Sequence, residues 1–440
     1  MEEEEEVNAY LQSCGGFVAC HDAGSKGRIL VATRDYQSGE VIYSEPPLHI
    51  IEEDEDSEVF QRLEDFAARH ALYSARWYWC ALNSMTASDL EQFAQLPCSI
   101  ISEGLQRQLL WLCAPDENAS EALPVFQELL HDLGMADVPT EVTRKFWQLL
   151  QVWKYNSFEY SDDPVASAIY LQASFHSHDC NPNANWVADD AGLTLRARHF
   201  IPAGQEVTIS YLSDEELFES TSQRRMRLKI SKDFHCCCQR CAELWDRSRG
   251  VRCQCGRLRF LDVEGSMLSP CDAGCNWPSV DEVLRREELL VLLCRQQADA
   301  DRATRLASAQ TFAAAAEQLL PRHWATECLW KWLAEGCATK LEAKDCEAKR
   351  LRFLQDAYEG AKRNTHTAWV MSSLAMWTLS SCGALQHATP PDCSARVRDS
   401  GALELLKEAA GLLKDLNGED DKYFRHVQRN LERVSHLDTA

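Results

Sequence analysis

The chain contains 440 residues, of which 45% are apolar and 26% are charged, and its formal net charge is -23. This excess of carboxylates disfavours binding to a phosphate backbone, which depends on Lys and Arg side chains that displace counterions. The sequence also has no apolar run near the roughly 18 residues that cross a bilayer. We therefore expect a soluble, monomeric protein that binds neither nucleic acid nor a membrane and whose surface suits a basic partner.

The cysteine content indicates a reducing compartment. The chain has 20 Cys, and its opening MEEEEEV has neither the basic nor the apolar region of a secretory signal. Closely spaced thiols in such a compartment bind metal more often than they form disulfides. We expect a cytoplasmic or nuclear location, and we expect residues 1–14 to form a solvated acidic tail.

The expected elements change character several times along the chain. Residues 15–53 alternate Gly-containing turns with short β-branched runs, which predicts a β-meander. Amphipathic patterns such as FQRLEDFAARHAL predict a helical insertion over residues 54–150. Strand patterns return in 151–232, where LTLRARHF and EVTISYL flank the turn IPAGQ and predict a hairpin. A cysteine-rich stretch at 233–279 precedes a helical domain at 280–440, whose helix pairs could be tetratricopeptide-like although no fixed period is apparent.

Three closely spaced cysteines in FHCCCQRC are candidate metal ligands: Cys236, Cys238 and Cys241. A structural zinc site needs four ligands in a tetrahedron, so a fourth must come from elsewhere in the chain. Cys180 is the candidate, because the surrounding SHDCNPN is polar and turn-forming. The alternative, buried thiols without a metal, is the rarer outcome for such spacing. Cys237 is left over and could point outward.

A second group of four cysteines forms two close pairs separated by a hairpin-sized segment. CQCG contains Cys253 and Cys255, and CDAGC contains Cys271 and Cys275. The arrangement resembles a zinc ribbon, and its spacing favours metal binding over free thiols.

Five short motifs occur in an order that resembles the SET-domain lysine methyltransferases: KGR, NSF, SHDCNPN, GQEVTISY and FHCCCQRC. With the helical insertion, the pattern over roughly residues 15–280 is similar to the branch in which a MYND finger sits inside the SET domain. The finger is missing, because residues 51–150 contain only Cys80, Cys98 and Cys113. The resemblance implies an α+β fold, with a β-rich SET domain split by the insertion, a zinc-binding post-SET region and an all-helical C-terminal domain.

The resemblance also implies that the chain uses S-adenosylmethionine to methylate a lysine of another protein, in a histone tail or another basic segment. The residues that match the family's cofactor contacts are Lys26, Gly27, Arg28, Asn156, Ser174, Ser177, His178, Tyr211 and Phe234. Two positions depart from the family's NHSCxPN motif, since Ser177 replaces the asparagine and Asp179 replaces the serine. A serine cannot reproduce both the donor and the acceptor of an amide, so this departure could weaken cofactor binding.

Tyr211 stands at the position of the family's catalytic tyrosine, where it would orient the amine and the methyl group. An apolar channel and the sulfonium charge would lower the pKa of the entering lysine. Phe234 would stack over the adenine or line that channel, and Lys232 stands where an aromatic residue often precedes it in the family. Zinc would tie the segment of Phe234 to SHDCNPN without a direct part in the chemistry.

Two other functions fit part of the pattern. A catalytically weak or inactive SET scaffold that serves as a protein-interaction module is favoured by the departures at Ser177 and Lys232. The retained Tyr211 and His178 and the complete cysteine set argue against it. A zinc-dependent nucleic-acid binder fits the cysteines but conflicts with the net charge and lacks a basic recognition helix.

Overall fold

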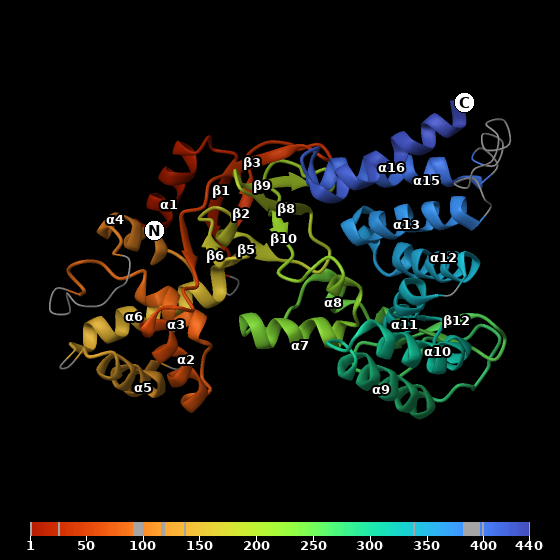
Figure 1. Cartoon of the computed structure of the whole chain (residues 1–440), viewed down its shortest axis with the longest axis horizontal. Coiled ribbons are helices and arrows are strands. Elements are labelled where there is room, and N and C mark those ends of the chain that lie inside the picture. The colour runs from red at the N-terminus through yellow and green to blue at the C-terminus, as the bar shows by residue number, and fades with distance from the viewer. Residues whose placement is uncertain are drawn as a thin grey trace.

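Two apolar cores organise the computed structural model, which describes residues 2–24, 27–90, 100–115, 119–135, 138–337, 339–381, 397 and 400–439. One core gathers side chains from Val7 to Ile209, and the other gathers Cys180 and side chains from Leu212 to Val434. Figure 1 shows the first half of the chain at the left and the C-terminal helices stacked at the right.

The strands of the first half form small, mostly antiparallel sheets, with orders β1-β2, β3-β9-β8 and β4-β6-β5. Their side chains alternate between the core and the surface, as in β9, because successive residues of a strand face opposite sides. The bounds are β1 (Val18–Asp22), β2 (Arg28–Ala32), β3 (Val41–Glu45), β4 (His49–Glu52), β5 (Phe158–Asp162), β6 (Val165–Ile169), β8 (Ala184–Asp189) and β9 (Gly192–Ala197).

A short parallel pair, β7 (Ser177–His178) and β10 (Thr208–Ile209), joins two distant segments. The backbone N–H of Asp179 donates to the Ile209 carbonyl at 2.9 Å. Asn183 extends this contact between the two segments, because its Oδ1 accepts from the Thr208 N–H at 2.8 Å. SHDCNPN is thereby held against GQEVTISY.

Helices fill the predicted insertion: α2 (Glu58–His70), α3 (Ala75–Leu82), α4 (Glu103–Leu109), α5 (Ala119–Asp132) and α6 (Thr140–Asn156). Helix α2 buries Phe60, Leu63 and Phe66 at the spacing of one helical face. Helix α6 contributes Trp147 and Trp153, which are buried in the same core. The insertion is therefore part of the first core and is not a separate domain.

The expected solvated tail over residues 1–14 is wrong for most of its length, because Glu2–Ser13 form helix α1. Val7 and Leu11 lie one helical turn apart and are buried in the first core. Asn8 fixes the helix to β1, since its side chain donates to the Cys20 carbonyl and accepts from the Cys20 N–H. The run of glutamates is typical of a solvated segment, but burial of this apolar pair stabilises the helix.

After the first half come α7 (Thr221–Lys232), α8 (Gln239–Ala242) and a sheet in which β11 (Trp245–Arg252) lies between β12 (Leu258–Asp262) and β13 (Arg322–His323). The buried Arg249 of β11 donates to both carboxylate oxygens of Glu287 in α9 (Val280–Gln296), at 2.7 and 2.6 Å. The sheet is thus bound to the helical domain by a paired charge.

The C-terminal domain is a succession of helices in which neighbours from α10 to α16 pack on one another. Their bounds are α9 (Val280–Gln296), α10 (Arg302–Leu319), α11 (Trp324–Gly336), α12 (Lys340–Asp356), α13 (Thr365–Ser381), α15 (Ala402–Asn417) and α16 (Lys422–Thr439). Short 3-10 helices lie at η2 (Ala173–Phe175), η3 (Glu216–Phe218) and η4 (Glu359–Arg363). The mixed fold agrees with the predicted class, while the tetratricopeptide likeness stays a prediction. None of the described helices has the length and apolarity needed to cross a membrane.

Candidate active site and cysteine clusters

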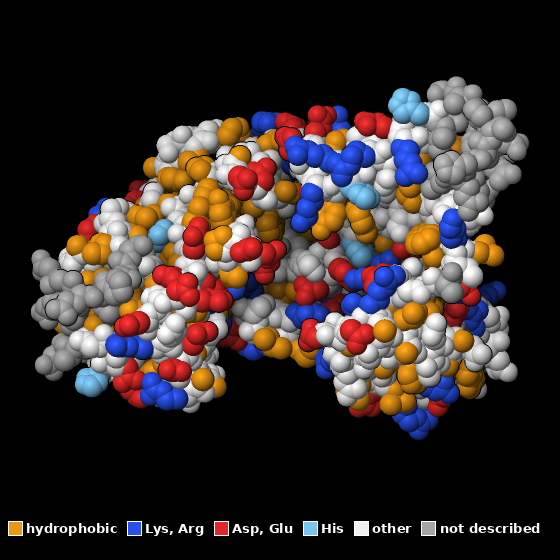
Figure 2. All heavy atoms as spheres, viewed as in Figure 1, with side chains coloured by type: hydrophobic (Ala, Val, Ile, Leu, Met, Phe, Trp, Pro, Cys, Tyr) orange, Lys and Arg blue, Asp and Glu red, His pale blue; other side chains and the backbone are white. Residues whose placement is uncertain are grey.

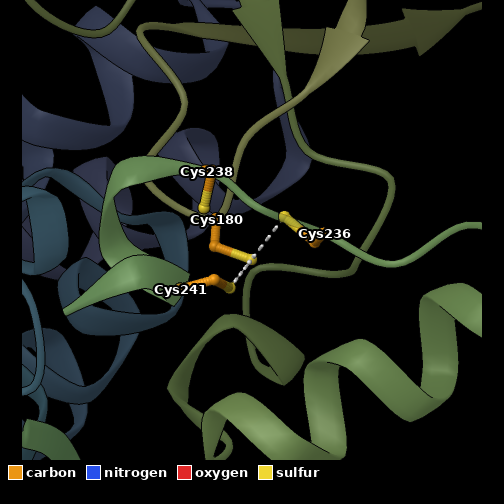
Figure 3. Close-up of side chains that lie close together, drawn as sticks. All are labelled: Cys180, Cys236, Cys238 and Cys241. Carbon is orange, nitrogen blue, oxygen red and sulfur yellow. Dashed lines mark hydrogen bonds between the residues drawn. The ribbon is translucent and has the colours of Figure 1, made fainter. Parts of the chain in front are cut away.

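Four cysteines from two distant segments meet at one point. The sulfurs of Cys180, Cys236, Cys238 and Cys241 all lie within 4.8 Å of one another. Cys180 follows β7, and its sulfur lies 3.5 Å from that of Cys241 and 4.0 Å from that of Cys236 (Figure 3). Cys238 caps α8 and Cys241 lies within it. Four converging thiols, mostly buried, are the donor set of a structural zinc site.

Arginines surround this cluster, which we call the first cysteine cluster. The buried Arg224 of α7 points its Nη2 at the Cys241 sulfur, 3.6 Å away. Arg240 donates to the Cys180 carbonyl at 2.8 Å, and Arg225 donates to the Cys236 carbonyl at 3.1 Å. Hydrogen bonds from the neighbouring thiols, Cys180 first, lower the pKa of Cys241, and the charge of Arg224 lowers it further. The surroundings of Cys241 therefore favour its thiolate.

His178 connects the first cysteine cluster to Tyr211. Its Nε2 lies 3.2 Å from the Cys180 sulfur, and its Nδ1 accepts from the Tyr211 N–H at 3.0 Å. Burial lowers the pKa of His178 to about 4, so the ring is neutral at physiological pH. A neutral ring with its proton on Nε2 satisfies both contacts.

Tyr211 directly follows the β10 region, and its hydroxyl donates to the His176 carbonyl at 2.6 Å. Its ring centre lies 6.3 Å from that of Phe234, which is 6.1 Å from the ring of His178. Burial raises the pKa of Tyr211 although 37% of the residue remains exposed, so the hydroxyl keeps its proton. The three rings form a wall beside a fixed hydroxyl.

The residues expected to contact the cofactor lie around the same region. Ser177 is in β7, with its backbone opposite Thr208. Ser174 donates to the Asn156 carbonyl at 3.1 Å, which holds NSF against the segment before SHDCNPN. Gly27 has φ +75°, and a Cβ there would meet no atom of the described residues within 4 Å; Lys26 lies outside the described residues.

Two of these residues bind the middle of the helical insertion, between α4 and α5, which the sequence did not indicate. Arg28 donates to the Trp111 carbonyl and places its guanidinium 5.0 Å from the Phe175 ring centre. Asn156 donates to the Cys113 carbonyl at 2.8 Å. The segment around Trp111 and Cys113 therefore closes one side of the site, and only the tertiary fold reveals it.

Lys232 also lies in the site. Its Nζ donates to the Tyr155 carbonyl at 2.9 Å and lies 5.6 Å from the Tyr211 ring centre. The departure at this position was visible in the sequence, but the direction of the side chain was not.

The other four predicted ligands form a second cysteine cluster, in which the sulfurs of Cys253, Cys255, Cys271 and Cys275 lie within 4.8 Å of one another. Cys271 lies 3.5 Å from Cys253 and 3.6 Å from Cys255, sulfur to sulfur. The pairs follow β11 and β12, so the hairpin brings them together. Cys237 is exposed and belongs to neither cluster.

Comparison with known proteins places a family model over part of the chain, since residues 27–212 match the SET domain. A SET and MYND domain-containing protein of Dictyostelium discoideum is 33% identical over 104 residues, which are 23% of this chain and 24% of the relative. Histone-lysine N-methyltransferase SMYD3 of Mus musculus is 36% identical over 77 residues, 18% of this chain and 17% of the relative. Histone-lysine N-methyltransferase SET5 of Meyerozyma guilliermondii is 30% identical over 142 residues, 31% of this chain and 25% of the relative.

These matches span a quarter or less of the relatives' own length. Among solved structures, Rubisco LSMT bound to AdoMet aligns with 99% of this chain and 93% of its own, at 13% identity and a TM-score of 0.31. That likeness is too low to support an argument about fold or function.

Proposed function

We propose that this protein transfers methyl groups from S-adenosylmethionine to lysine side chains of other proteins, because residues 27–212 match the SET domain and are similar to parts of SET and MYND domain-containing proteins. The observation that carries the proposal is the continuous connection from the first cysteine cluster through His178 to Tyr211. This connection links Tyr211 to the segments of Cys180 and Cys236, which lie 56 residues apart in the sequence.

The residues that would hold the cofactor are Gly27, Arg28, Asn156, Ser174, Ser177, His178 and Phe234. The fit rests on the open space beside Gly27 and on the aromatic wall of Phe234 next to His178. Lys26 belongs to the same expected set. When bound, S-adenosylmethionine supplies a methyl group attached to a positively charged sulfur.

The chain's own residues would position the acceptor. The Tyr211 hydroxyl donates its hydrogen bond to the His176 carbonyl, so the lone pairs of its oxygen can accept a hydrogen bond from an incoming amine. An ammonium that packs against the rings of Tyr211 and Phe234 would lose part of its hydration and release its proton more readily. Alignment of a neutral amine then supplies most of the acceleration.

In this proposal each cysteine cluster binds one zinc ion. The first ion has four thiolate ligands and no open position, so its role is to tie the segment of Phe234 to that of Cys180. The second ion would join the two cysteine pairs that follow β11 and β12. Both therefore stabilise structure and take no part in proton or methyl transfer.

We expect the acceptor lysine to lie in a basic segment such as a histone tail, because the net charge of -23 attracts such a partner. Figure 2 shows carboxylates gathered at the lower left, over the helices of the insertion. A cytoplasmic or nuclear location and a monomeric state remain part of the proposal.

The test is a methylation assay with labelled donor, histones and cell extract, comparing wild type with Tyr211→Phe. We expect the variant to lose roughly 10²-fold or more of the activity, the size typical of removing one positioned catalytic oxygen. Tyr423→Phe, a change in the remote helix α16, serves as the matched control and should keep full activity. Equal labelling by wild type and Tyr211→Phe would contradict the role given to Tyr211.

A second function, an inactive scaffold that binds other proteins, is favoured by Ser177 and by the lysine at position 232. Calorimetric titration with S-adenosylmethionine separates the two, because a scaffold without a cofactor pocket gives no heat of binding. Absence of binding to the folded, zinc-loaded protein would overturn the enzymatic proposal.

A further inference from the structure

Lys232 ends α7 at a position between the candidate catalytic residue and an expected cofactor contact. Its amine lies 5.6 Å from the Tyr211 ring centre and donates to the carbonyl of Tyr155, the residue before Asn156. Two contacts from different elements thus fix the amine between the Tyr211 ring and the end of α6.

One structural role for Lys232 is to cap the C-terminal end of α6, because cations are favourable near the last carbonyls of a helix. This role accounts for the hydrogen bond to the Tyr155 carbonyl but not for the contact with the Tyr211 ring. Within the described part of the chain no carboxylate forms an ion pair with Lys232, whereas Lys229 on the same helix pairs with Asp233. A half-buried lysine without a counter-charge costs folding free energy, because its charge loses hydration and gains no ion pair.

The surroundings also favour the neutral amine. Loss of hydration lowers the pKa of Lys232 to about 8, Lys154 acts in the same direction, and Cys113 opposes both. At neutral pH a measurable fraction of this amine therefore carries a free electron pair, in contrast to a lysine with the ordinary value near 10.4.

We propose that Lys232 is a methyl acceptor built into the site and is methylated by its own molecule. This inference rests on the proposed function. In the step, the Nζ electron pair forms a bond to the methyl carbon of S-adenosylmethionine, the carbon–sulfur bond breaks, and its electrons remain on sulfur as a neutral thioether. The product is a methylammonium, which then releases a proton to water.

A first experiment needs no methyl donor. Trace labelling of amines with acetic anhydride across pH 6–10, followed by peptide mass spectrometry, compares Lys232 with the exposed Lys229. We expect Lys232 to titrate near pH 8, about two pH units below the ordinary value of a lysine. Equal titration of the two amines would show that the Lys232 amine is not enclosed and would overturn the inference.

A second experiment incubates the zinc-loaded full chain with labelled S-adenosylmethionine and maps the label by tandem mass spectrometry. We expect methyl groups on Lys232 and none on Lys229, at a first-order rate that does not change with protein concentration. Lys232→Arg should lose the label at that position, and Lys229→Arg should keep it. A rate that rises with protein concentration would show transfer between molecules and overturn methylation in cis.

The two proposals fail in different ways. If the wild type binds the donor and labels a lysine-rich peptide while Lys232 stays unmodified, the inference fails and the proposed function stands. If the folded protein does not bind the donor, the proposed function fails and self-methylation fails with it.

Discussion

Cys180 is the residue on which the first cysteine cluster depends, because it is the ligand contributed from outside the 236–241 segment. Its side chain is fully buried, and its sulfur contacts those of Cys236 and Cys241. Replacement by serine removes a soft thiolate from a site that needs four ligands. We expect Cys180→Ser to bind one zinc ion fewer per chain and to lose S-adenosylmethionine binding, measured by native mass spectrometry and calorimetry.

Two matched variants make this result specific. Cys253→Ser, in the second cluster, should also lose one ion but keep donor binding, because that cluster is not connected to Tyr211 through His178. Cys237→Ser, at an exposed cysteine outside both clusters, should change neither quantity. Identical metal content in Cys180→Ser and wild type would contradict the assignment of Cys180 as a ligand.

Residue types and spacing were enough to anticipate which cysteines would gather, since closely spaced thiols have few other uses. The partnership of Cys180 with the trio came from the family resemblance and the polar setting, and the structure brings the four together. The contacts of Arg28 and Asn156 with the carbonyls of Trp111 and Cys113 could not be anticipated. Backbone carbonyls are the same at every residue, so no pattern marks the ones that a side chain will reach.

At the scale of elements, helix α1 shows that a segment rich in glutamate can still pack into the core. Five consecutive glutamates suggest a solvated tail, yet the buried pair Val7 and Leu11 supplies the one-turn spacing that fixes the helix. Long amphipathic segments such as α2 and α6 were predictable because many residues repeat the pattern. The two-residue strands β7 and β10 were not, because a period of two cannot be recognised in two residues.

Leu11→Ala tests whether α1 belongs to the fold. Leu11 is 1% exposed in the first core, and truncating such a leucine costs about 2–5 kcal/mol of unfolding free energy. Chemical denaturation followed by circular dichroism measures the loss. Glu6→Ala, on the exposed face of the same helix, should cost less than about 0.5 kcal/mol. If Leu11→Ala and Glu6→Ala are equally stable, residues 2–13 do not contribute to the core.

At the scale of the whole molecule, the first half of the chain and the C-terminal helices are joined by a small polar network. Arg198, 2% exposed, donates to Asp214 Oδ1 at 2.5 Å. Asn364, which precedes α13, donates to the same carboxylate oxygen at 3.1 Å. Asn185 of β8 donates to the Leu416 carbonyl of α15 at 3.1 Å. These contacts fix the helical domain beside the site, which neither half of the sequence could indicate alone.

Asp214 makes this junction sensitive to acid. Burial by itself would raise the pKa of Asp214, but the charge of Arg198 and hydrogen bonds from Arg198 and Thr365 outweigh it and lower the value. A carboxyl whose pKa is lowered on folding stabilises the protein above its unfolded pKa, near 3.9, and this stabilisation is lost as the pH falls through the folded pKa. Glu287 and Glu327, whose pKa values are lowered to about 2 against the opposing effect of burial, add to the same acid-labile stability.

Asp214→Asn isolates the contribution of the junction. Because Arg198 stays buried and loses its partner charge, we expect the variant to lose roughly 3–5 kcal/mol of unfolding free energy at pH 7. The gap from wild type should begin to narrow below about pH 4, where the unfolded wild-type carboxyl takes up a proton. It should narrow further as the pH falls through the lowered folded pKa of Asp214, below which the residue is neutral like asparagine. Urea denaturation at pH 7, 5, 4 and 3 measures both quantities. Asp420→Asn, at an exposed partner of Arg425, should change little at any pH. A gap that stays constant from pH 7 to 3 would show that the charge on Asp214 does not hold the two halves together.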